Sequence, residues 1–454
     1  MSGIETCTVD VPGYFRADGC EPGVNVCLTG RRNMLETLSV NLGNLVLAFS
    51  DALDMAFPSL AAHQQRVAFI AWELAKQANF GRERCENIFM AGLLHDIGAL
   101  SIEEKKAVHD IDTYDFERHC IRGERLFQLS PWLEQSAPLV RNHHLAWSKS
   151  EGPRDTPAAV DAQILHLADD LERHIDRGVY VLNQAETLLD RLRALAGTEL
   201  NPDIVDLFGA LAGREEFWLD LSSPRLYALL LRKNALREIE LDMNGIKTFA
   251  ALLAMIIDFK SSFTATHSAG VSRSAALLAR IAGMSESDAE LMEVAGLLHD
   301  LGKLVVPNSI LEKPGGLTKA EMNVVKQHTY HTFNILNMIP GFQTIAGWAA
   351  YHHERLDGKG YPFKLPEGGI DSGARIMAVA DLFTAVAEDR PYRRGMETEA
   401  IRMILRDQAD LGLRDARITK LLIDNMSDIR RSVAQAQEAA ANFYRTELSS
   451  AGKR

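Results

Sequence analysis

The chain has 454 residues, 46% hydrophobic and 24% charged, a composition that predicts a globular protein with room for two domains. Its net charge of −12 argues against non-specific binding to nucleic acid, because no surplus of Lys and Arg is available to neutralise phosphates. The chain starts without a basic stretch followed by an apolar run, and its longest apolar stretch, around residues 249–257, is too short to cross a bilayer, so we expect a cytoplasmic protein without a membrane segment.

Residues 1–33 form the first predicted segment. They are rich in glycine, include two prolines and hold three of the five cysteines of the chain. Glycine and proline at this density predict an irregular segment. The odd number of cysteines, without C-x-x-C spacing, indicates reduced thiols in a reducing compartment.

Helical periodicity dominates the rest of the chain. Apolar residues recur at three- and four-residue intervals in residues 67–75 and again in 271–282. Long alternating strand patterns are missing from both regions. We therefore predict an all-α fold with two tandem domains, at residues 34–196 and 245–454.

Connecting helices are predicted between the domains, at residues 197–244. They include a charged amphipathic stretch at 225–242. We interpret this stretch as a packing helix with a solvated face, and the alternative is a helix between the domains or at a homodimer interface.

One set of metal-type ligands occurs twice in the chain. The N-terminal set is His63, His95, Asp96, His119, His143, His144 and Asp169, and the C-terminal set is His267, His299, Asp300, His328, His352, His353 and Asp381. In both copies 32 residues separate the first His from the His-Asp pair, and 24 separate the third His from the His-His pair. In addition, AGLLHDIGAL (91–100) matches AGLLHDLGKL (295–304) in eight of ten positions. A fold does not need histidines at matched intervals, so a duplicated metal-binding domain follows.

The ligand set predicts the kind of metal centre. Five histidines and two aspartates per domain exceed what one four-coordinate zinc ion requires. They fit two ions about 3.5–4 Å apart, the arrangement that clamps a phosphoryl group and generates hydroxide. Mixed nitrogen and oxygen ligands favour Fe, Mn, Co or Zn over Mg or Ca.

Four motifs in the C-terminal half carry a family resemblance. They are HDLGK (299–303), HHERLDGKGYP (352–362), VADLF (379–383) and DRPYR (389–393). Together they resemble the HD-GYP family of the HD superfamily, helical phosphodiesterases of bacterial cyclic dinucleotides. The match covers about residues 245–430. The N-terminal half resembles an HD domain without the GYP signature, so the chain looks like a tandem HD plus HD-GYP protein.

The resemblance implies a role for each C-terminal ligand. One ion would bind to His267, His299, Asp300 and Asp381, and a second to His328, His352 and His353, with Asp300 bridging the two. Family members with a third ion carry Glu where this chain has Phe263, so we expect two ions, Fe or Mn. Hydroxide between the ions would attack phosphorus, and Asp300 would act as a catalytic residue.

The resemblance also implies substrate and partner contacts. Lys303 would be catalytic, stabilising charge on a phosphate oxygen in the transition state. Tyr361, Arg390 and Arg393 would contact the substrate, and the guanidinium groups suit both phosphate and guanine. The GYP loop would also receive a GGDEF-type partner protein.

The N-terminal copy keeps every ligand type but loses other parts. Ala99 stands at the position of Lys303, HHLAWSKSEGP (143–153) replaces the GYP motif, and DRGVY (176–180) replaces DRPYR. We expect this copy to hold metal, to have lost cyclic dinucleotide hydrolysis and to serve regulation, sensing or dimer formation. A distinct hydrolytic activity is the alternative.

The leading hypothesis for the whole chain is metal-dependent hydrolysis of a cyclic dinucleotide, c-di-GMP or 3'3'-cGAMP, to the linear dinucleotide. Two alternatives stay open. One is a non-catalytic cyclic-dinucleotide receptor, against which the intact ligand set and Lys303 argue. The other is a diiron HD protein that activates O2, against which Lys303 and the GYP loop argue in the C-terminal half.

Overall fold

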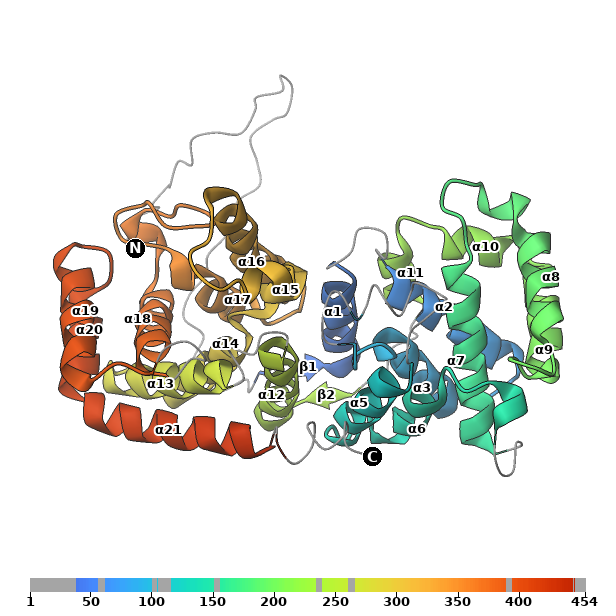
Figure 1. Cartoon of the computed structure of the whole chain (residues 1–454), viewed down its shortest axis with the longest axis horizontal. Helices are drawn as coiled ribbons and strands as arrows, with labels where there is room; N and C mark the ends of the chain where they lie inside the picture. The colour runs from blue at the N-terminus through green and yellow to red at the C-terminus, as the bar shows by residue number, and fades with distance from the viewer. Residues whose placement is uncertain are drawn as a thin grey trace, which may run out of the picture. The chain divides into compact units, whose positions relative to one another are not determined.

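The computed structural model describes most of the chain from residue 38 onward (Figure 1). The segments outside the described residues are 1–37, 56–61, 100–103, 105–115, 151–155, 234–238, 260–265, 389–393, 444 and 446–454. The predicted irregular segment 1–33, Phe263, Arg390 and Arg393 therefore lie outside the described residues.

The described residues are helical almost throughout, which confirms the predicted all-α fold. The N-terminal half contains α1 (Leu42–Asp54), α2 (His63–Gln77), α3 (Arg82–Leu94), α5 (Phe116–Gln128), α6 (Ala137–Asn142), α7 (Pro157–Arg173), α8 (Ala185–Leu195), α9 (Pro202–Ala212), α10 (Glu215–Leu221) and α11 (Leu226–Arg232). The C-terminal half contains α12 (Met243–Phe259), α13 (His267–Ile281), α14 (Glu286–Leu298), α15 (Asn308–Leu311), α16 (Lys319–Asn337), α17 (Gln343–Ala350), α18 (Ser372–Ala387), α19 (Thr398–Asp410), α20 (Ala416–Asp424) and α21 (Met426–Phe443).

Shorter elements complete the described fold. The 3₁₀ helices are η2 (Glu134–Ser136), η3 (Trp147–Lys149), η4 (Val181–Asn183), η5 (Leu301–Val305), η6 (Tyr351–His353) and η7 (Glu367–Gly369). Strands β1 (Val40–Asn41) and β2 (Glu240–Leu241) pair antiparallel, with Val40 opposite Leu241. The amphipathic helix expected over 225–242 is shorter in the structure, because α11 ends at Arg232 and β2 occupies the end of that stretch.

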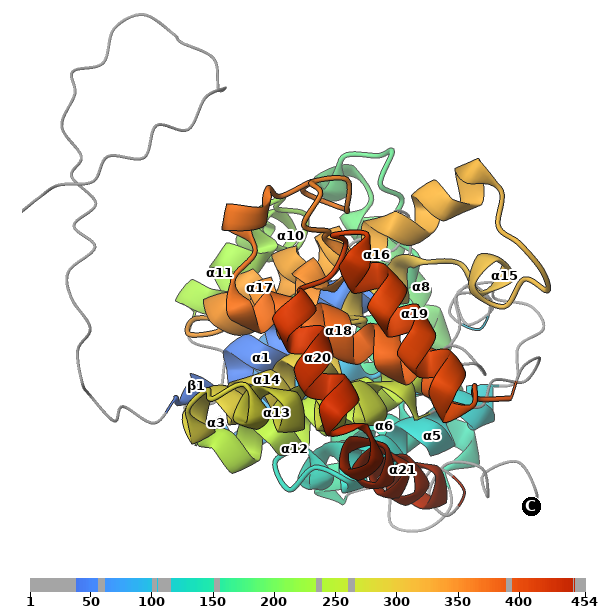
Figure 2. The same ribbon diagram turned by 90° about the vertical axis from the view of Figure 1, so that its left-hand side faces the viewer.

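The duplication is visible in the packing of the helices. In the N-terminal half α2 packs against both α3 and α7, and in the C-terminal half α13 packs against both α14 and α18. The apolar residues on α2 and α13 that predicted these helices are buried in the core, namely Val67, Ile70, Ala71, Leu74, Ala75, Val271, Ala275, Leu278 and Ala279. Figure 2 turns the C-terminal half toward the viewer and shows α19 and α20, which contact each other, beside α18.

Local sequence signals explain where the ligand-bearing helices begin. Thr318 and Glu321 form a capping box at the start of α16, in which each side chain accepts the backbone N–H of the other residue. The Asp371 side chain accepts a hydrogen bond from the backbone N–H of Ala374 at the start of α18. Thr156 caps α7 in the same way, with Pro157 at its first position.

The glycine after each His-Asp pair lets two backbones approach closely. A Cβ atom on Gly302 would lie 1.9 Å from the carbonyl oxygen of His328, and one on Gly98 would lie 2.0 Å from that of His119. Only glycine therefore lets the turn after the pair pack against the helix that carries the third histidine. This contact brings the two parts of the ligand set together in both halves.

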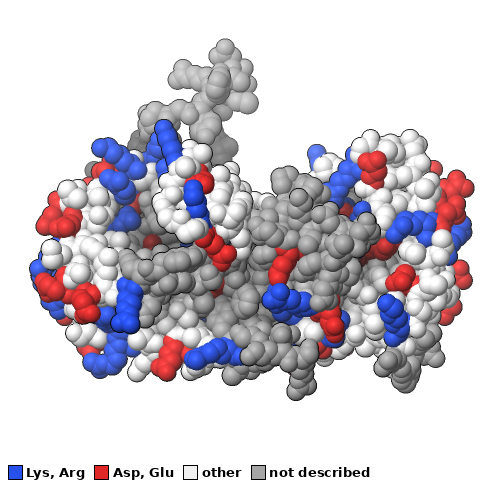
Figure 3. Space-filling model, in the orientation of Figure 1, with Lys and Arg blue, Asp and Glu red and all other residues white. Residues whose placement is uncertain are grey.

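Two further observations concern possible membrane helices and the charge on the surface. None of the helices in the described part of the chain has both the length and the apolar character needed to cross a membrane. On the face shown in Figure 3, basic and acidic side chains are interspersed. The predicted domain boundaries stay predictions.

Candidate metal centres and substrate site

The ligand-type residues lie at or near helix ends, where backbone geometry fixes their positions. His63 and His267 are the first residues of α2 and α13. His95 and His299 directly follow the last residues of α3 and α14. All four side chains are buried.

The structure brings both predicted sets together. Ligand atoms within 4.8 Å of one another come from His267, His299 and Asp381, from His299, Asp300 and His352, and from His328, His352 and His353. In the N-terminal half they come from His63, His95 and Asp169, and from Asp96, His119, His143 and His144. Each half thus offers two adjoining groups, as a centre with two ions requires.

Asp300 connects the two C-terminal groups. Its Oδ2 lies 3.2 Å from Nε2 of His299, and its Oδ1 lies 3.4 Å from Nε2 of His328. Because the two carboxylate oxygens face different groups, Asp300 has the geometry of a bridging ligand.

Asp96 occupies the corresponding place in the N-terminal half. Its Oδ2 lies 3.4 Å from Nε2 of His95, and its Oδ1 lies 3.5 Å from Nε2 of His119. The bridging geometry is therefore present in both copies.

Backbone carbonyls orient several of the imidazole rings. Nδ1 of His299 donates to the carbonyl of Gly296 at 2.8 Å, and Nδ1 of His352 donates to that of Ala349 at 2.6 Å. Nδ1 of His328 makes the same kind of bond three residues back, at 2.7 Å. A proton held on Nδ1 leaves Nε2 with its lone pair directed into the site, which is the form that binds metal.

A glutamate takes the place of the carbonyl at the first histidine of each set. Nδ1 of His267 donates to Glu388 Oε2 at 3.1 Å, and Nδ1 of His63 contacts Glu172. Burial lowers the pKa of His267, but the charges of Glu388 and Asp381 outweigh that effect and raise it to about 10. This end of the site therefore favours a bound cation.

The residues present fit a pair of metal ions. Nε2 of His299, Nε2 of His95 and Oδ1 of Asp169 are buried without a hydrogen-bond partner among the described residues. Buried polar atoms in proteins normally have a partner, so such atoms pointing into one cluster indicate a ligand that satisfies them. Burial also lowers the pKa of His328 to about 4 and that of His353 to about 3, which keeps both rings neutral. The assignment of individual ligands stays a prediction.

The two halves differ in the cation beside the cluster. Nζ of Lys303 lies 2.5 Å from Oδ2 of Asp300, so the ammonium adjoins the carboxylate that lies between the two histidine groups. In the N-terminal half Ala99 fills the position of Lys303 and is buried. Arg173 supplies a cation at another point there, with Nη1 3.5 Å from Oδ2 of Asp169.

The GYP loop reaches the C-terminal cluster through Tyr361. The ring of Tyr361 lies 4.8 Å from that of His353, and Lys326 Nζ lies 5.5 Å from its centre. The buried carboxylate of Glu354 accepts backbone N–H bonds from residues 363–365 and fixes the exit of the loop. Tyr361 is therefore placed beside a ligand-type histidine, while Arg390 and Arg393 lie outside the described residues.

A pocket of about 520 Å³ opens onto the N-terminal cluster, a size common for small-molecule sites. Its lining includes His144 and Cys120. Cys120 Sγ lies 3.7 Å from Nε2 of His119 and 3.7 Å from Nδ1 of His143. Burial raises the pKa of the Cys120 thiol, but His143 and His119 outweigh this and lower it to about 6. Because His144 belongs to the cluster and also lines the pocket, a ligand can reach this cluster from outside.

Several residues of the sites were missed from the sequence. Asp54 and Asp258 both stand nine residues before the first histidine, an interval that could have revealed them. Asp258 accepts a hydrogen bond from the backbone N–H of Ser268 at 3.2 Å, and Asp54 accepts one from Gln64 at 2.9 Å. These carboxylates fix the helix starts that carry His267 and His63.

Other missed residues gave no such signal. Glu172 and Glu388 stand at different distances from the last aspartate of each set, three and seven residues. Arg414, between α19 and α20, donates to the carbonyl of Glu354 at 2.6 Å and so supports the GYP loop from far along the chain.

Comparison with known proteins defines the class to which this fold and these sites belong. Two models of the HD domain match residues 60–174 and 251–417, which together span more than half of the chain. The chain belongs to the HD-domain proteins. With its HDLGK and GYP motifs, it is a tandem HD plus HD-GYP chain.

Individual relatives agree with this class. The chain is 29% identical over 397 residues to the 3'3'-cGAMP-specific phosphodiesterase 1 of Vibrio cholerae, covering 85% of this chain and 92% of that protein. It is 36% identical over 191 residues to the cyclic di-GMP phosphodiesterase response regulator RpfG of Xanthomonas campestris pv. campestris, covering 42% of this chain and 50% of that one. The crystal structure of the cyclic GMP-AMP-specific phosphodiesterase V-cGAP3 of Vibrio cholerae has the same fold, with a TM-score of 0.58 at 22% identity over 89% of this chain and 98% of that one.

Proposed function

We propose that the C-terminal half hydrolyses a phosphodiester bond of a bacterial cyclic dinucleotide, which makes the chain a phosphodiesterase. The observation that carries this proposal is the position of Asp300 between two histidine groups, with the ammonium of Lys303 beside it. The relatives named above are cyclic dinucleotide phosphodiesterases, and they support the same class of substrate.

Different residues of the chain would have different roles in hydrolysis. Two divalent ions, Fe or Mn, when bound, would supply activation of water and Lewis-acid stabilisation of the phosphate. The N–H bonds from Nδ1 orient the imidazoles, and Asp300, which lies between the two groups, would contribute one oxygen to each. Lys303 would meet a non-bridging phosphate oxygen and stabilise the charge that grows on it. Water adds to phosphorus, the P–O3′ bond breaks and the 3′ oxygen takes up a proton, giving the linear dinucleotide with a 5′ phosphate.

The substrate is the finer part of the proposal. The 3'3'-cGAMP-specific phosphodiesterase 1 matches 85% of this chain, across both halves, whereas the match to the c-di-GMP enzyme covers 42% of it. We therefore take 3'3'-cGAMP as the first substrate to test and c-di-GMP as the second. Tyr361, Arg390 and Arg393 would hold the substrate, and the GYP loop would contact a GGDEF-type partner.

Incubation of the metal-loaded protein with each cyclic dinucleotide tests the proposal. Chromatography of the products should show the linear dinucleotide, with a faster rate for the preferred substrate. Calorimetry and an oxygen electrode, used on the same preparation, separate the alternatives. Tight binding without product would instead indicate a receptor, and O2 consumption without hydrolysis would indicate a diiron oxygenase.

A further inference from the structure

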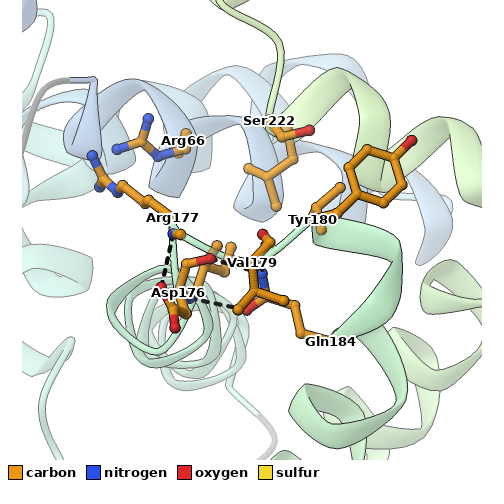
Figure 4. Close-up of a pocket in the computed structure, with 11 residues that line it drawn as sticks. Arg66, Asp176, Arg177, Val179, Tyr180, Gln184 and Ser222 are labelled. Carbon is orange, nitrogen blue, oxygen red and sulfur yellow. Dashed lines mark hydrogen bonds between the residues drawn. The ribbon is translucent and has the colours of Figure 1, made fainter.

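A second pocket lies in the N-terminal half and is lined by other residues than the ligand-type cluster. Its volume is about 570 Å³, within the range of small-molecule sites. Its walls are Arg66 on α2, residues 175–180 between α7 and η4, Val181 at the start of η4, Gln184, and Leu221 and Ser222 at the end of α10 (Figure 4). None of the residues that line it belongs to the predicted ligand sets.

The turn that forms one wall is held in a fixed conformation. Nε2 of Gln184 donates to the carbonyls of Asp176 and Val179 at 2.9 and 3.0 Å. Oε1 of Gln184 accepts the backbone N–H of Asp176 at 2.9 Å. The Asp176 carboxylate accepts the backbone N–H of Gly178 at 2.8 Å, which adds another hydrogen bond within the turn. The pocket is therefore largely preformed, which reduces the entropy lost on binding.

Two guanidinium groups lie on one side of this pocket. Nε of Arg66 lies 2.6 Å and Nη2 of Arg177 lies 2.8 Å from the same oxygen, Oε1 of Glu172. Figure 4 shows the two arginines side by side. Two planar cations that share one carboxylate oxygen can also meet a phosphate, which offers several oxygens to such a pair.

An exposed aromatic ring lies on the other side of the pocket. The Tyr180 side chain is 60% exposed, and in Figure 4 it lies with Ser222 across the pocket from Arg66 and Arg177. An exposed phenol ring at a preformed pocket offers a stacking surface for a planar ring of a ligand, as aromatic side chains do for bases in nucleic-acid complexes.

We propose that this pocket binds a small phosphorylated compound that carries a planar ring, with the chemistry of a nucleoside monophosphate. The phosphate faces Arg66 and Arg177, and the ring stacks on Tyr180. The pocket is linked to the N-terminal cluster, because Glu172, which holds both arginines, also contacts Nδ1 of His63. A phosphate that draws the arginines away from Glu172 removes two cations from the carboxylate that contacts His63. The ligand therefore regulates the N-terminal centre.

Isothermal titration calorimetry of the full-length, metal-loaded protein with GMP, AMP and inorganic phosphate tests the binding. We expect one nucleotide-binding event in the wild type to depend on this pocket. Tyr180→Ala and Arg177→Met should each abolish that event or lower its affinity at least tenfold. Tyr180→Phe, which keeps the ring, and Arg193→Met, on α8 and paired with Asp190, should leave this event within twofold. Because Tyr180 is exposed, Tyr180→Ala is expected to fold, and circular dichroism checks this.

Two outcomes would overturn the proposal. Identical isotherms for the wild type, Tyr180→Ala and Arg177→Met would exclude nucleotide binding at this pocket. Inorganic phosphate that binds as tightly as GMP and AMP, unaffected by Tyr180→Ala, would exclude the role of the ring. Neither outcome depends on turnover, so the result is separable from the proposed phosphodiesterase activity.

The regulatory link has its own measurement. Saturating nucleotide should change the metal affinity of the chain severalfold in the wild type, and this change should vanish in Tyr180→Ala, because coupling between two sites is reciprocal. Titration against a metal indicator in Asp300→Ala, which weakens the C-terminal centre, reports on the N-terminal cluster. A metal affinity that is indifferent to the nucleotide would overturn the regulatory link.

Discussion

Glu388 accepts a hydrogen bond from Nδ1 of His267 at 3.1 Å, at the point where the chain leaves α18. The carboxylate is buried, so its negative charge acts on the imidazole with little screening by water. Such a carboxylate–histidine pair fixes the tautomer and orientation of a metal ligand and makes its other nitrogen more basic.

Replacing Glu388 by Gln should weaken metal binding. The amide keeps a hydrogen-bond acceptor but removes the charge that polarises His267, and loss of such a partner typically costs about 10–100-fold in metal affinity. Titration against a competing chelator measures the change. Glu399→Gln, at an exposed position in the first turn of α19, is the matched control. Equal affinities for the two variants would contradict the role of Glu388.

Gly302→Ala should destabilise the C-terminal half. The new Cβ would lie 1.9 Å from the carbonyl oxygen of His328, so the turn after the His-Asp pair must move. Overpacking of this kind costs about 1–3 kcal/mol, and it should also lower metal content. Thermal unfolding and elemental analysis provide the measurements. Gly316→Ala, where a Cβ meets nothing within 4 Å, is the control, and identical melting of the two variants would refute the close approach.

Lys303→Met should lower kcat while metal content is retained. The ammonium beside Asp300 is expected to stabilise transition-state charge, and removing one such group typically costs about 10²–10³-fold in kcat. Steady-state kinetics and elemental analysis on the same sample separate chemistry from metal loading. Lys420→Met, at an exposed position on α20, serves as control. Activity that falls only in proportion to the metal content would assign Lys303 a structural role instead.

Asp258→Asn should change how stability depends on pH. Burial raises the pKa of Asp258 to about 7 against the opposing effect of His267, so between pH 3.8 and about 7 the folded state binds a proton that the unfolded state releases. This carboxyl therefore contributes stability at low pH that is lost as the pH rises through 7. Thermal unfolding of the metal-free proteins should show that the melting temperature of the variant rises relative to that of the wild type between pH 5 and pH 8. A difference between variant and wild type that stays constant with pH would contradict the shift, and Asp190→Asn, at an exposed position, is the control substitution.

The helices and both ligand clusters could be predicted because their signals are periodic or duplicated. The apolar residues of α2 and α13 follow helical spacing, and the histidines recur at equal intervals. Because the two halves pack their helices in the same way, residues at equal sequence intervals reach equivalent positions. Asp96 and Asp300 therefore occupy matching places.

The residues that support the clusters escaped prediction where their positions follow no repeat. Glu172 and Glu388 reach the same nitrogen of His63 and His267 from different points along the chain, so no interval connects them. Arg414 reaches the GYP region only because the chain returns to it between α19 and α20. The pocket of Arg66 and Tyr180 likewise combines segments separated by more than a hundred residues.

The turnover of Asp300→Ala and Asp96→Ala, compared with 3'3'-cGAMP and c-di-GMP as substrates, tests the central claim most directly. Each variant removes the carboxylate that lies between the two histidine groups of one half and leaves the residues of the other half unchanged. The account predicts that Asp300→Ala abolishes formation of the linear dinucleotide, whereas Asp96→Ala retains it. Full turnover in Asp300→Ala, together with its loss in Asp96→Ala, would contradict the account.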